Sequence, residues 1–408
     1  MKMRVFEKIL MFLVFYLVFK VVYGKYQSMR QKPKKVGAER EPIRFAVAIP
    51  AHNEGESIAR TVKSILEAGI VVEDSILDAT IAGIDSIFKA SIAPEDIFIL
   101  CNGCTDNTAQ EIKKCGVVPV IVPCKGKEET LTYSIDVLKL FPEEKYSHVC
   151  FFDADTEIDR FYFKRIGEKL EQNPEADIVC GRPKSLPYNW LTAHRAVQYF
   201  TFHTVHKTAQ EGWGAILVVP GCAGVYSTAS LKKIVWSPDT RIGDMDATIQ
   251  AALLGMKIVF EPRAVVYTQD PNNIRDYTTQ LYRRWNRGLW MNMRKHGILW
   301  KKWGRPFSML HWDCRIMFLE QFNPFIFLLA VWKMHLHYYL WSGLAIFVAI
   351  ALFETLACAL MEKRWDILKY FPIFPFMRVY DTLLFIASMP SILVKREKSG
   401  VWESPKRY

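Results

Sequence analysis

The stretch Phe151-Phe152-Asp153-Ala154-Asp155-Thr156 brings two carboxylates, one residue apart, to the end of a run of β-forming residues that begins at His148. Residues two apart in an extended strand share a face, so Asp153 and Asp155 can both reach one site beyond the strand. Carboxylate oxygens suit Mg²⁺ or Mn²⁺, which usually keep waters and also bind substrate phosphates. The stretch therefore predicts a clamp for a divalent metal and a diphosphate. The alternative is a solvated turn.

The composition bounds the class of protein. Of the 408 residues, 50% are hydrophobic, so the chain can bury a sizeable core and still have apolar segments left for a membrane. Nine cysteines without the paired spacing of a disulfide framework favour reduced thiols facing the cytosol, and Asn and Gly between Cys101 and Cys104 favour a turn over a redox pair. Much of the net charge of +11 lies beside apolar segments, so we expect no nucleic-acid partner.

Residues 1–24 are predicted to form a transmembrane anchor. Val5 to Tyr23 is almost wholly apolar and can span a bilayer if Lys20 reaches the interface. No clear small-residue cleavage site follows, which favours a retained anchor over a removed signal peptide. Basic residues are denser after this segment than before it, so the positive-inside rule places the following domain in the cytosol.

Residues 304–394 are predicted to form an interfacial and transmembrane region. Three apolar segments lie here, and only the middle one is a convincing span: Ile316 to Trp332, Tyr338 to Met361 and Phe371 to Val394. Prolines and ionisable residues make the third a poor lipid-facing span, and an interfacial or buried helix is the alternative. Arg378 and Asp381 are three residues apart, so they share a helix face and can pair. We expect this segment to face protein or product, and the basic tail, residues 395–408, to return to the cytosol.

Residues 43–303 are predicted to form a cytosolic domain of alternating strands and helices, with interfacial helices from about residue 275. Such alternation implies an α/β fold, a Rossmann-related and mostly parallel sheet with helices on both faces. Ligands bind such sheets beyond the carboxyl ends of the strands, which is where the polar clusters of this chain fall. The expected strands are Phe45–Pro50, Ile97–Cys101, Val117–Val122 and His148–Phe152, and the expected helices are Asn53–Glu67, Thr108–Lys114 and Leu131–Leu140.

Five motifs in order resemble the family 2 inverting glycosyltransferases, which have a GT-A fold. The resemblance covers about Phe45 to Arg287. It is strongest to the membrane-embedded polysaccharide synthases that make hyaluronan, chitin, cellulose or poly-N-acetylglucosamine, whose membrane segments flank the domain in the same layout. The motifs are Ile49-Pro50-Ala51-His52-Asn53-Glu54, Asn102-Gly103-Cys104-Thr105-Asp106-Asn107-Thr108, Gly126-Lys127, the Asp153/Asp155 pair and Arg284-Trp285.

The resemblance implies a nucleotide-diphospho-sugar donor, with a UDP-sugar favoured, and Mg²⁺ or Mn²⁺ as cofactor. Sugar transfer must neutralise a departing diphosphate, and a metal held by Asp155, with Asp153 on the ribose or the metal, would do so. In the family, the end of the first strand and the turn after the second strand hold the nucleotide base. Here that turn begins Cys101-Asn102, where the family more usually has Asp-Asp or Asp-Asn, so the identity of the base is left undecided. The implied donor-binding residues are Pro50, Asn53, Glu54, Asn102, Asp106, Lys127, Asp153, Arg284 and Trp285.

Displacement at an anomeric carbon also needs a general base for the acceptor hydroxyl. The segment Arg241 to Thr248 precedes a helical pattern and is similar to the family's Thr-Glu-Asp segment. The resemblance puts the base on Asp244, with Gly243 in place of the usual Glu, and Asp246 is the second candidate. The alternative is that either Asp merely caps a helix.

The segment Gln280 to Arg287 resembles the Gln-x-x-Arg-Trp motif of the processive synthases, although Gln280 is one residue further from Trp285 than that motif requires. The resemblance implies that Trp285 lines the acceptor end of the site and that Arg284 meets the diphosphate. An indole face suits the apolar face of a sugar, and a guanidinium fork suits phosphate oxygens. A basic amphipathic helix on a membrane surface is the alternative.

We therefore expect a membrane-bound inverting glycosyltransferase of the cell membrane that extends an extracellular polysaccharide and exports it through its own membrane segments. The expected partners are a glycan or lipid-linked acceptor, membrane lipid and accessory export subunits. Transfer of a single sugar to a lipid-linked acceptor and a catalytically silent membrane scaffold are the alternatives. Two segments have no settled role: the apparent insertion Val71–Ser91, and Pro220–Gly224, a close-packed wall under the acceptor or a plain turn.

Overall fold

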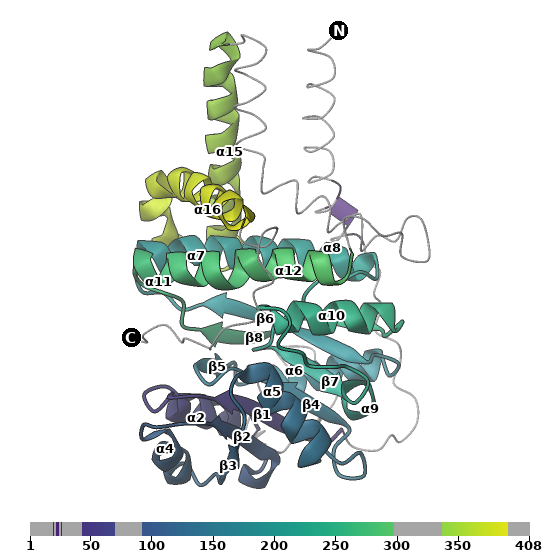
Figure 1. Ribbon diagram of the computed structural model, residues 1–408. Coiled ribbons are helices and arrows are strands. Elements are labelled where there is room, and N and C mark those ends of the chain that lie inside the picture. Colours follow the sequence, from purple (N-terminus) through teal and green to yellow (C-terminus); the bar gives the residue numbers. More distant parts are fainter. Residues whose placement is uncertain are drawn as a thin grey trace, which may run out of the picture.

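Figure 1 shows the computed structural model of the chain, which describes residues 43–69, 92–297 and 337–390, together with the isolated residues Phe19, Val22, Tyr23 and Tyr26. These parts include every residue predicted above to bind donor, metal or acceptor. Four predicted segments lie wholly or mostly outside the described residues: the anchor 1–24, the insertion 71–91, the apolar segment 316–332 and the tail 395–408.

The first half of the sheet is parallel, as the sequence predicts. Val47 pairs with Ile97 on one side and with Cys150 on the other, and the two neighbouring strands run in the same direction as its own. These strands are apolar runs with side chains buried on both faces, which is typical of parallel strands. The spatial order is β3-β2-β1-β4, with bounds Phe45–Ala51 (β1), Ile97–Asn102 (β2), Pro119–Val122 (β3) and His148–Phe151 (β4).

The second half of the sheet is mixed, so the expectation of a mostly parallel sheet is correct only for the first half. β7 runs antiparallel to β4 and β6, β6 and β8 are parallel, and β5 is antiparallel to β8. The first residue of β7, Gly224, pairs with the last residue of β4, Phe151, so the two strands run in opposite directions. The eight strands follow the order β3-β2-β1-β4-β7-β6-β8-β5, with bounds Thr156–Ile158 (β5), Ile178–Ser185 (β6), Gly224–Ser227 (β7) and Ile258–Thr268 (β8).

Helices cover both faces of the sheet, with a hydrophobic core on each. Alternate residues of β1 point to opposite faces, so Val47 and Ile49 join one core while Ala46 and Ala48 join the other. The first core includes α2 (Ile58–Gly69), α4 (Thr108–Lys114) and α6 (Tyr162–Gln172); the second includes α5 (Lys127–Thr132), α9 (Thr228–Leu231) and α10 (Gly243–Leu253). The predicted helix Leu131–Leu140 begins earlier, as α5, and continues as the π-helix η3 (Tyr133–Val137); the 3₁₀ turn η2 (Pro94–Asp96) precedes β2.

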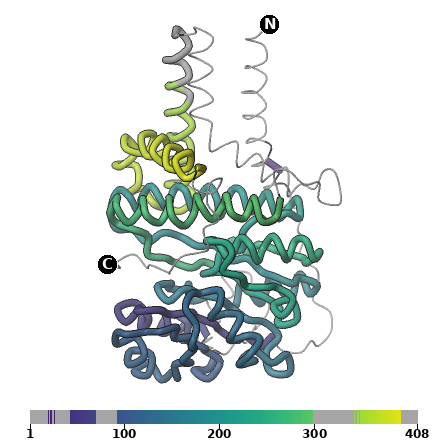
Figure 2. The backbone as a smooth tube through the Cα atoms, in the orientation of Figure 1, coloured from purple at the N-terminus to yellow at the C-terminus, as the bar shows by residue number. Residues whose placement is uncertain are grey.

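A layer of long helices lies over one side of this α/β core, as the backbone path in Figure 2 shows. Two nearly continuous runs form the layer, and each contains a π-helical turn. Their elements are α7 (Trp190–Phe200), η4 (Thr201–His206) and α8 (Lys207–Gly212) in the first run, and α11 (Ile274–Thr279), η5 (Gln280–Asn286) and α12 (Arg287–Lys295) in the second.

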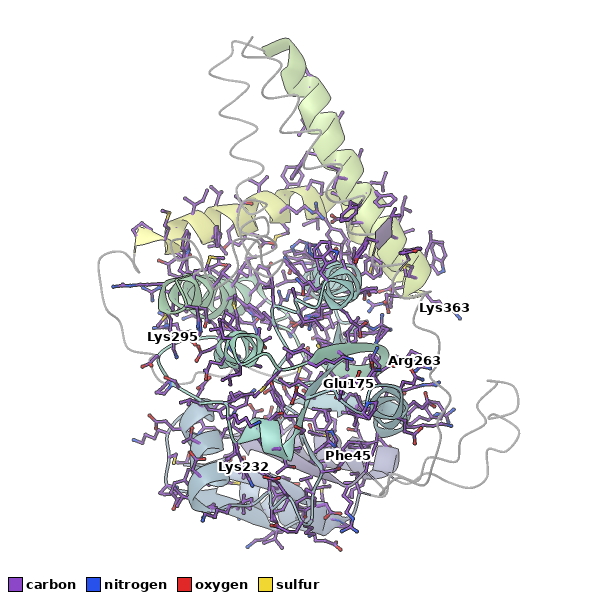
Figure 3. All side chains as sticks on the ribbon, turned by 90° about the vertical axis from the view of Figure 1, so that its right-hand side faces the viewer. Phe45, Glu175, Lys232, Arg263, Lys295 and Lys363 are labelled. Carbon is purple, nitrogen blue, oxygen red and sulfur yellow. The ribbon has the colours of Figure 1, made fainter. Side chains whose placement is uncertain are left out.

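The last described elements have different orientations. α15 (His337–Met361) extends away from the helical layer, whereas α16 (Phe374–Ser388), which follows the 3₁₀ segment η6 (Trp365–Ile373), lies across it (Figures 1 and 3). Phe374 and Phe385 of α16 are buried against the layer. Trp341 and Phe353 of α15 are exposed.

Among the described residues, one helical segment is long and apolar enough to cross a membrane, Trp365–Ser388, and 28% of its apolar 18-residue window is buried. The apolar part of α15, Phe347–Met361, is shorter. The sequence favoured Tyr338–Met361 as the span, whereas length and composition in the structure select the segment that follows it. A single helix of this kind is weak support for a membrane span, because packed helices of soluble proteins share these properties.

Arg378 and Asp381, whose spacing allows them to pair, have other partners in the structure. Arg378 forms an ion pair with Glu354 of α15. Asp381 accepts hydrogen bonds from the Tyr277 hydroxyl and the Gln198 amide, each at 2.7 Å. Both side chains reach partners on neighbouring helices, so tertiary packing overrides the local spacing. This face of α16 is therefore turned towards protein.

Replacing Asp381 tests how α16 is held. Asp381→Leu removes the shared hydrogen-bond partner of His194, Gln198 and Tyr277 and leaves the buried Tyr277 hydroxyl without its acceptor. We expect the free energy of unfolding to fall by about 2 kcal/mol, measured by thermal unfolding of the full chain in detergent. The control is Asp366→Leu, because the Asp366 carboxylate is half-exposed and pairs with Arg364. Equal unfolding temperatures for the two variants would contradict the packing role of Asp381.

Candidate functional site

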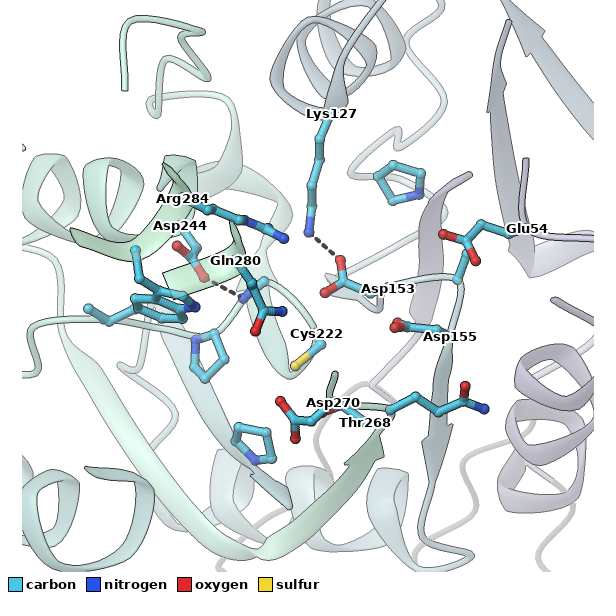
Figure 4. Close-up of a pocket in the computed structure, with 18 of the residues that line it drawn as sticks. Glu54, Lys127, Asp153, Asp155, Cys222, Asp244, Thr268, Asp270, Gln280 and Arg284 are labelled. Carbon is cyan, nitrogen blue, oxygen red and sulfur yellow. Dashed lines mark hydrogen bonds and ion pairs between the residues drawn. The ribbon is translucent and has the colours of Figure 1, made fainter. Parts of the chain in front are cut away.

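A pocket lies at the carboxyl ends of the parallel strands (Figure 4). Its empty volume is about 1050 Å³, which includes space that is open to solvent. Strand ends of both halves of the sheet contribute to it, and so do the helical layer and the loop before β7. Its lining residues include Pro50, His52, Glu54, Asn102, Lys127, Asp153, Ala154, Asp155, Tyr199, His203, Pro220, Gly221, Cys222, Asp244, Thr268, Gln269, Asp270, Gln280, Arg284 and Trp285.

Asp153 and Lys127 face each other across this pocket and form an ion pair (Figure 4). Lys127 is the first residue of α5 and follows Gly126, whose φ of +103° is a conformation that favours glycine. Burial alone would lower the pKa of Lys127, but the Asp153 and Asp244 carboxylates together hold that pKa above its usual value. The ammonium group therefore stays charged beside the carboxylate.

Asp155 lines the same pocket as Asp153. Among the described residues, no group of three or more His, Cys, Asp and Glu side chains is arranged to hold a metal ion. Mg²⁺ or Mn²⁺ does not require one, because such ions are commonly bound by one or two carboxylates together with water and substrate phosphates. Carboxylates such as Asp153 and Asp155 suit that type of ion.

The residues expected to hold the nucleotide base divide into two groups. Pro50, Glu54 and Asn102 line the pocket, and Asn53 and Asp106 do not. Asn53 has a positive φ of 54°, and its side-chain oxygen accepts from the Thr105 amide at 2.8 Å. Asp106 accepts from the Gly55 amide at 3.1 Å. These two residues tie the loop after β1 to the loop after β2, which shapes the pocket edge.

Asp244 lines the pocket from the N-terminus of α10. One carboxylate oxygen accepts from the Gly221 amide at 3.1 Å, and the other accepts from the Met245 amide at 2.9 Å. These bonds orient the side chain and satisfy a free amide of the first helical turn. The position therefore combines a helix-end contact with access to the pocket.

Asp246 has a different environment and does not line the pocket. It is 1% exposed, and its carboxylate contacts Lys295 at 2.8 Å and His296 at 2.6 Å. Both partners lie at the end of α12. Of the two candidate bases, the structure thus brings only Asp244 to the site.

Gly243 makes room for a carboxylate from another segment. A Cβ atom at this position would lie 2.8 Å from Cγ of Glu128 and 3.0 Å from its Cδ. Burial raises the pKa of Glu128 above its usual value, although Lys127 and Arg284 oppose the shift. Where the resemblance leads one to expect a glutamate at residue 243, the Glu128 side chain occupies the adjoining space.

The extra residue between Gln280 and Trp285 is accommodated by a π-helix. The segment Gln280–Asn286 has the i to i+5 hydrogen bonding of such a helix, so its turn is wider than an α-helical turn. Gln280, Arg284 and Trp285 all line the pocket. The imperfect spacing of the motif therefore still delivers all three side chains to one site.

Sequence reasoning missed part of the pocket. Asp270 follows the end of β8, and Tyr199 and His203 project from α7 and η4. Asp270 had a signal, because it follows a strand just as Asp153 does. Tyr199 and His203 had none, since their helix carries no recognisable motif and reaches the pocket only through tertiary packing.

Two family models match the chain. The model described as glycosyl transferase family group 2 matches residues 148–359, just over half of the chain. The model described as glycosyl transferase family 2 matches residues 46–235. Both matches include Asp153 and Asp155, and the first also includes Asp244 and Arg284.

Curated relatives resemble the chain over part of their length. A probable glucomannan 4-beta-mannosyltransferase of Oryza sativa subsp. japonica is 28% identical over 158 residues, which are 38% of this chain and 28% of that protein. A probable glucomannan 4-beta-mannosyltransferase of Arabidopsis thaliana is 26% identical over 220 residues, 48% of this chain and 40% of that protein. The uncharacterised glycosyltransferase YaiP of Escherichia coli strain K12 is 27% identical over 291 residues, 68% of this chain and 63% of that protein. The chain thus spans less than two thirds of each relative.

A solved structure supports the predicted α/β fold. The mannosyltransferase PcManGT from Pyrobaculum calidifontis, in complex with GDP-Man and Mn²⁺, superposes with a TM-score of 0.56. The superposition covers 94% of this chain and 99% of that one at 15% sequence identity. Identity this low shows a shared fold, and the predicted GT-A-like architecture of the central domain is confirmed at that level.

The contact between Gly243 and Glu128 can be tested by a double-mutant cycle. Gly243→Ala should lower the free energy of unfolding by about 1–3 kcal/mol, because the added methyl group forces Glu128 to move. In a Glu128→Ala background the same substitution should cost clearly less, measured by thermal or denaturant unfolding. An equal cost in both backgrounds would show that Glu128 does not occupy this space.

Proposed function

The chain belongs to glycosyl transferase family group 2 and carries its glycosyltransferase domain, and we propose that it is a membrane-bound enzyme that transfers a sugar from a nucleotide diphosphate to a growing polysaccharide. One observation carries the proposal: a single pocket gathers a carboxylate pair, two cations and a separate carboxylate. A diphosphate leaving group requires the first two features, and an inverting displacement requires the third.

The proposed reaction assigns a role to each of these side chains. Lys127 and Arg284 contact the departing diphosphate and stabilise its charge as the bond between the anomeric carbon and the phosphate oxygen breaks. Asp244 takes the proton of the acceptor hydroxyl as that oxygen attacks the anomeric carbon. A divalent metal held by Asp155 and Asp153 would supply further charge stabilisation for the diphosphate.

The proposed donor is a nucleotide-diphospho-sugar, and its base is either uracil or guanine. The sequence resemblance favours a UDP-sugar. The solved neighbour with the same fold was obtained with GDP-Man and Mn²⁺, and two of the relatives are named mannosyltransferases. Cys101-Asn102 departs from the family's usual base-binding turn, so a donor panel must include both bases.

The proposed membrane attachment uses both ends of the chain. The exposed apolar side chains of α15 suit lipid, and Lys363, Arg364 and Lys369 lie in the turn and 3₁₀ segment after it, on the side expected to face the cytosol. We propose the organisation set out from the sequence: an anchor at 1–24, a cytosolic catalytic domain at 43–303, a membrane region at 304–394 and a cytosolic tail at 395–408. Export of the product and accessory export subunits belong to the same proposal.

The test is a donor panel with the purified full chain in detergent. UDP-glucose, UDP-N-acetylglucosamine, UDP-galactose, GDP-mannose and GDP-glucose are each supplied with Mg²⁺ or Mn²⁺, and release of nucleoside diphosphate is measured. We expect one donor to dominate and chelation to abolish release. Asp155→Asn should lose metal-dependent release while keeping its unfolding temperature. Release by this variant at the wild-type rate would contradict the metal site.

Product analysis with the active donor separates polymer synthesis from the alternatives. A ladder of products supports polymerisation, and a single addition to a lipid-linked acceptor would replace it with single-sugar transfer. No release from any donor by the wild-type chain would mean that the domain is catalytically silent.

The general base is tested by two substitutions that lie two residues apart. Asp244→Asn should lower turnover about 10²–10⁴-fold with little change in nucleotide affinity, because the proton moves only in the transition state. Asp246→Asn should instead lower the free energy of unfolding by about 3 kcal/mol, since it breaks the buried contacts with Lys295 and His296. If Asp246→Asn is the stable but inactive variant, the roles of the two residues are reversed.

A further inference from the structure

Two buried polar atoms without a hydrogen-bond partner lie in the pocket wall. Of the described residues that have such an atom, which is Oδ2 in Asp270 and Nδ1 in His203, these two are the ones that line the pocket. Buried polar atoms in proteins nearly always find a partner, so an unpaired one requires an explanation. Two in the same wall indicate that a ligand pairs with them.

Asp270 is held so that only one of its oxygens can serve a ligand. Its side chain is 2% exposed, and Oδ1 accepts from Arg195 Nε at 3.1 Å and from the Tyr199 hydroxyl at 3.1 Å. Oδ2 has no partner. Figure 4 shows the Asp270 carboxylate at the side of the pocket away from Lys127.

The groups that fix Asp270 keep it a hydrogen-bond acceptor. Burial raises the pKa of Tyr199, and the Asp270 carboxylate raises it further, so the phenol stays protonated and donates. Burial opposes the charge of Arg195, but Tyr199 and Asp270 hold its pKa above its usual value. A carboxylate flanked by a permanent cation and a donating phenol offers its remaining oxygen as an acceptor.

His203 completes this part of the wall as a neutral group. Burial and the nearby cations Lys207, Arg195 and Arg182 hold its pKa well below its usual value. Its ring packs edge-on against Tyr199, with centroids 5.1 Å apart and planes at 85°. A neutral imidazole can either donate or accept at Nδ1, which suits a hydroxyl group.

The chemistry of this wall excludes the charged parts of the donor. An unpaired carboxylate oxygen repels a phosphate and accepts from a neutral hydroxyl. The nucleotide-side residues Pro50, Asn102 and Lys127 come from the first half of the chain's sheet and from α5, whereas the wall comes from β8 and from the helical layer next to α16. A sugar bound on the side of the pocket that the helical layer lines would therefore contact this wall.

We propose that Asp270, His203 and Tyr199 form an acceptor wall that binds hydroxyl groups of the acceptor sugar, with Asp270 as the specificity-determining residue. This inference rests on the proposed sugar transfer. Asp270 Oδ2 accepts from one acceptor hydroxyl, and His203 pairs with another or with the same one. An acceptor that lacks the hydroxyl facing Asp270 leaves a buried carboxylate oxygen unpaired, so it binds poorly.

The test measures sugar binding and nucleotide binding separately in the full chain. Cellobiose, β-1,4-mannobiose and chitobiose are titrated against the protein by calorimetry, and UDP and GDP are titrated with Mn²⁺. Asp270→Asn should weaken binding of the preferred disaccharide by at least about tenfold and change nucleotide binding by less than about twofold. The control is Glu261→Gln, because Glu261 is a buried carboxylate on β8 that pairs with Arg263 outside the pocket, so this substitution should change neither.

A second variant covers the case in which Asp270→Asn fails to fold because Arg195 loses its partner. His203→Phe keeps an aromatic ring and removes the unpaired Nδ1 together with Nε2, so it should fold normally and still weaken disaccharide binding by about threefold or more. Unchanged disaccharide binding in both variants, or absence of disaccharide binding in the wild-type chain, would overturn the acceptor wall. An equal loss of nucleotide binding would assign Asp270 to the donor end. Failure of the wild-type chain to bind UDP and GDP would instead refute the proposed donor chemistry, and the disaccharide result would still stand.

Discussion

The pocket depends on holding Asp153 and Asp155 close together at the end of one strand. Two carboxylates in a partly enclosed site repel each other, so the fold must bring cations to face them. Lys127 does this from the start of α5, and Arg284 lies close enough to influence the same lysine. The parallel half of the sheet makes the arrangement possible, because it ends β1, β2 and β4 at the edge where α5 begins.

The same edge explains which site residues the sequence could reveal. An apolar run that gives way to polar residues marks a strand end, and this signal found Glu54, Asn102 and Asp153, all of which line the pocket. The sequence pattern could not decide which of Asp244 and Asp246 faces the pocket. Residues two apart on a helix point in nearly opposite directions, and only the packing of α12 decides that Asp246 is the one turned inwards. Asn53 and Asp106 also follow strand ends, yet their side chains bond the neighbouring loop instead of lining the pocket. Asn53 accepts from the loop after β2, and Asp106 accepts from the loop after β1.

Other features depend on contacts between distant segments, which no local pattern encodes. Glu128 and Gly243 are far apart in the chain, and their fit becomes visible only when α5 and α10 meet. The spacing from Gln280 to Trp285 is irregular for an α-helix, and the π-helical turn removes the irregularity. The antiparallel direction of β7 also depends on a distant contact. The loop before β7, with Pro220 and Cys222, lines the pocket, and β7 begins beside the end of β4.

The wall opposite Lys127 is connected to α16 by a continuous chain of hydrogen bonds. Arg195 bonds Asp270 through Nε and the Gln198 side-chain oxygen through Nη1, and the amide nitrogen of Gln198 in turn bonds Asp381. Each group uses one end for the pocket side and the other for the α16 side, so a displacement of α16 must break a buried bond or carry the wall with it. At the end of β4, Asp153 instead pairs with Lys127 of α5. The helical layer that packs against α16 therefore positions Asp270, while the sheet positions Asp153.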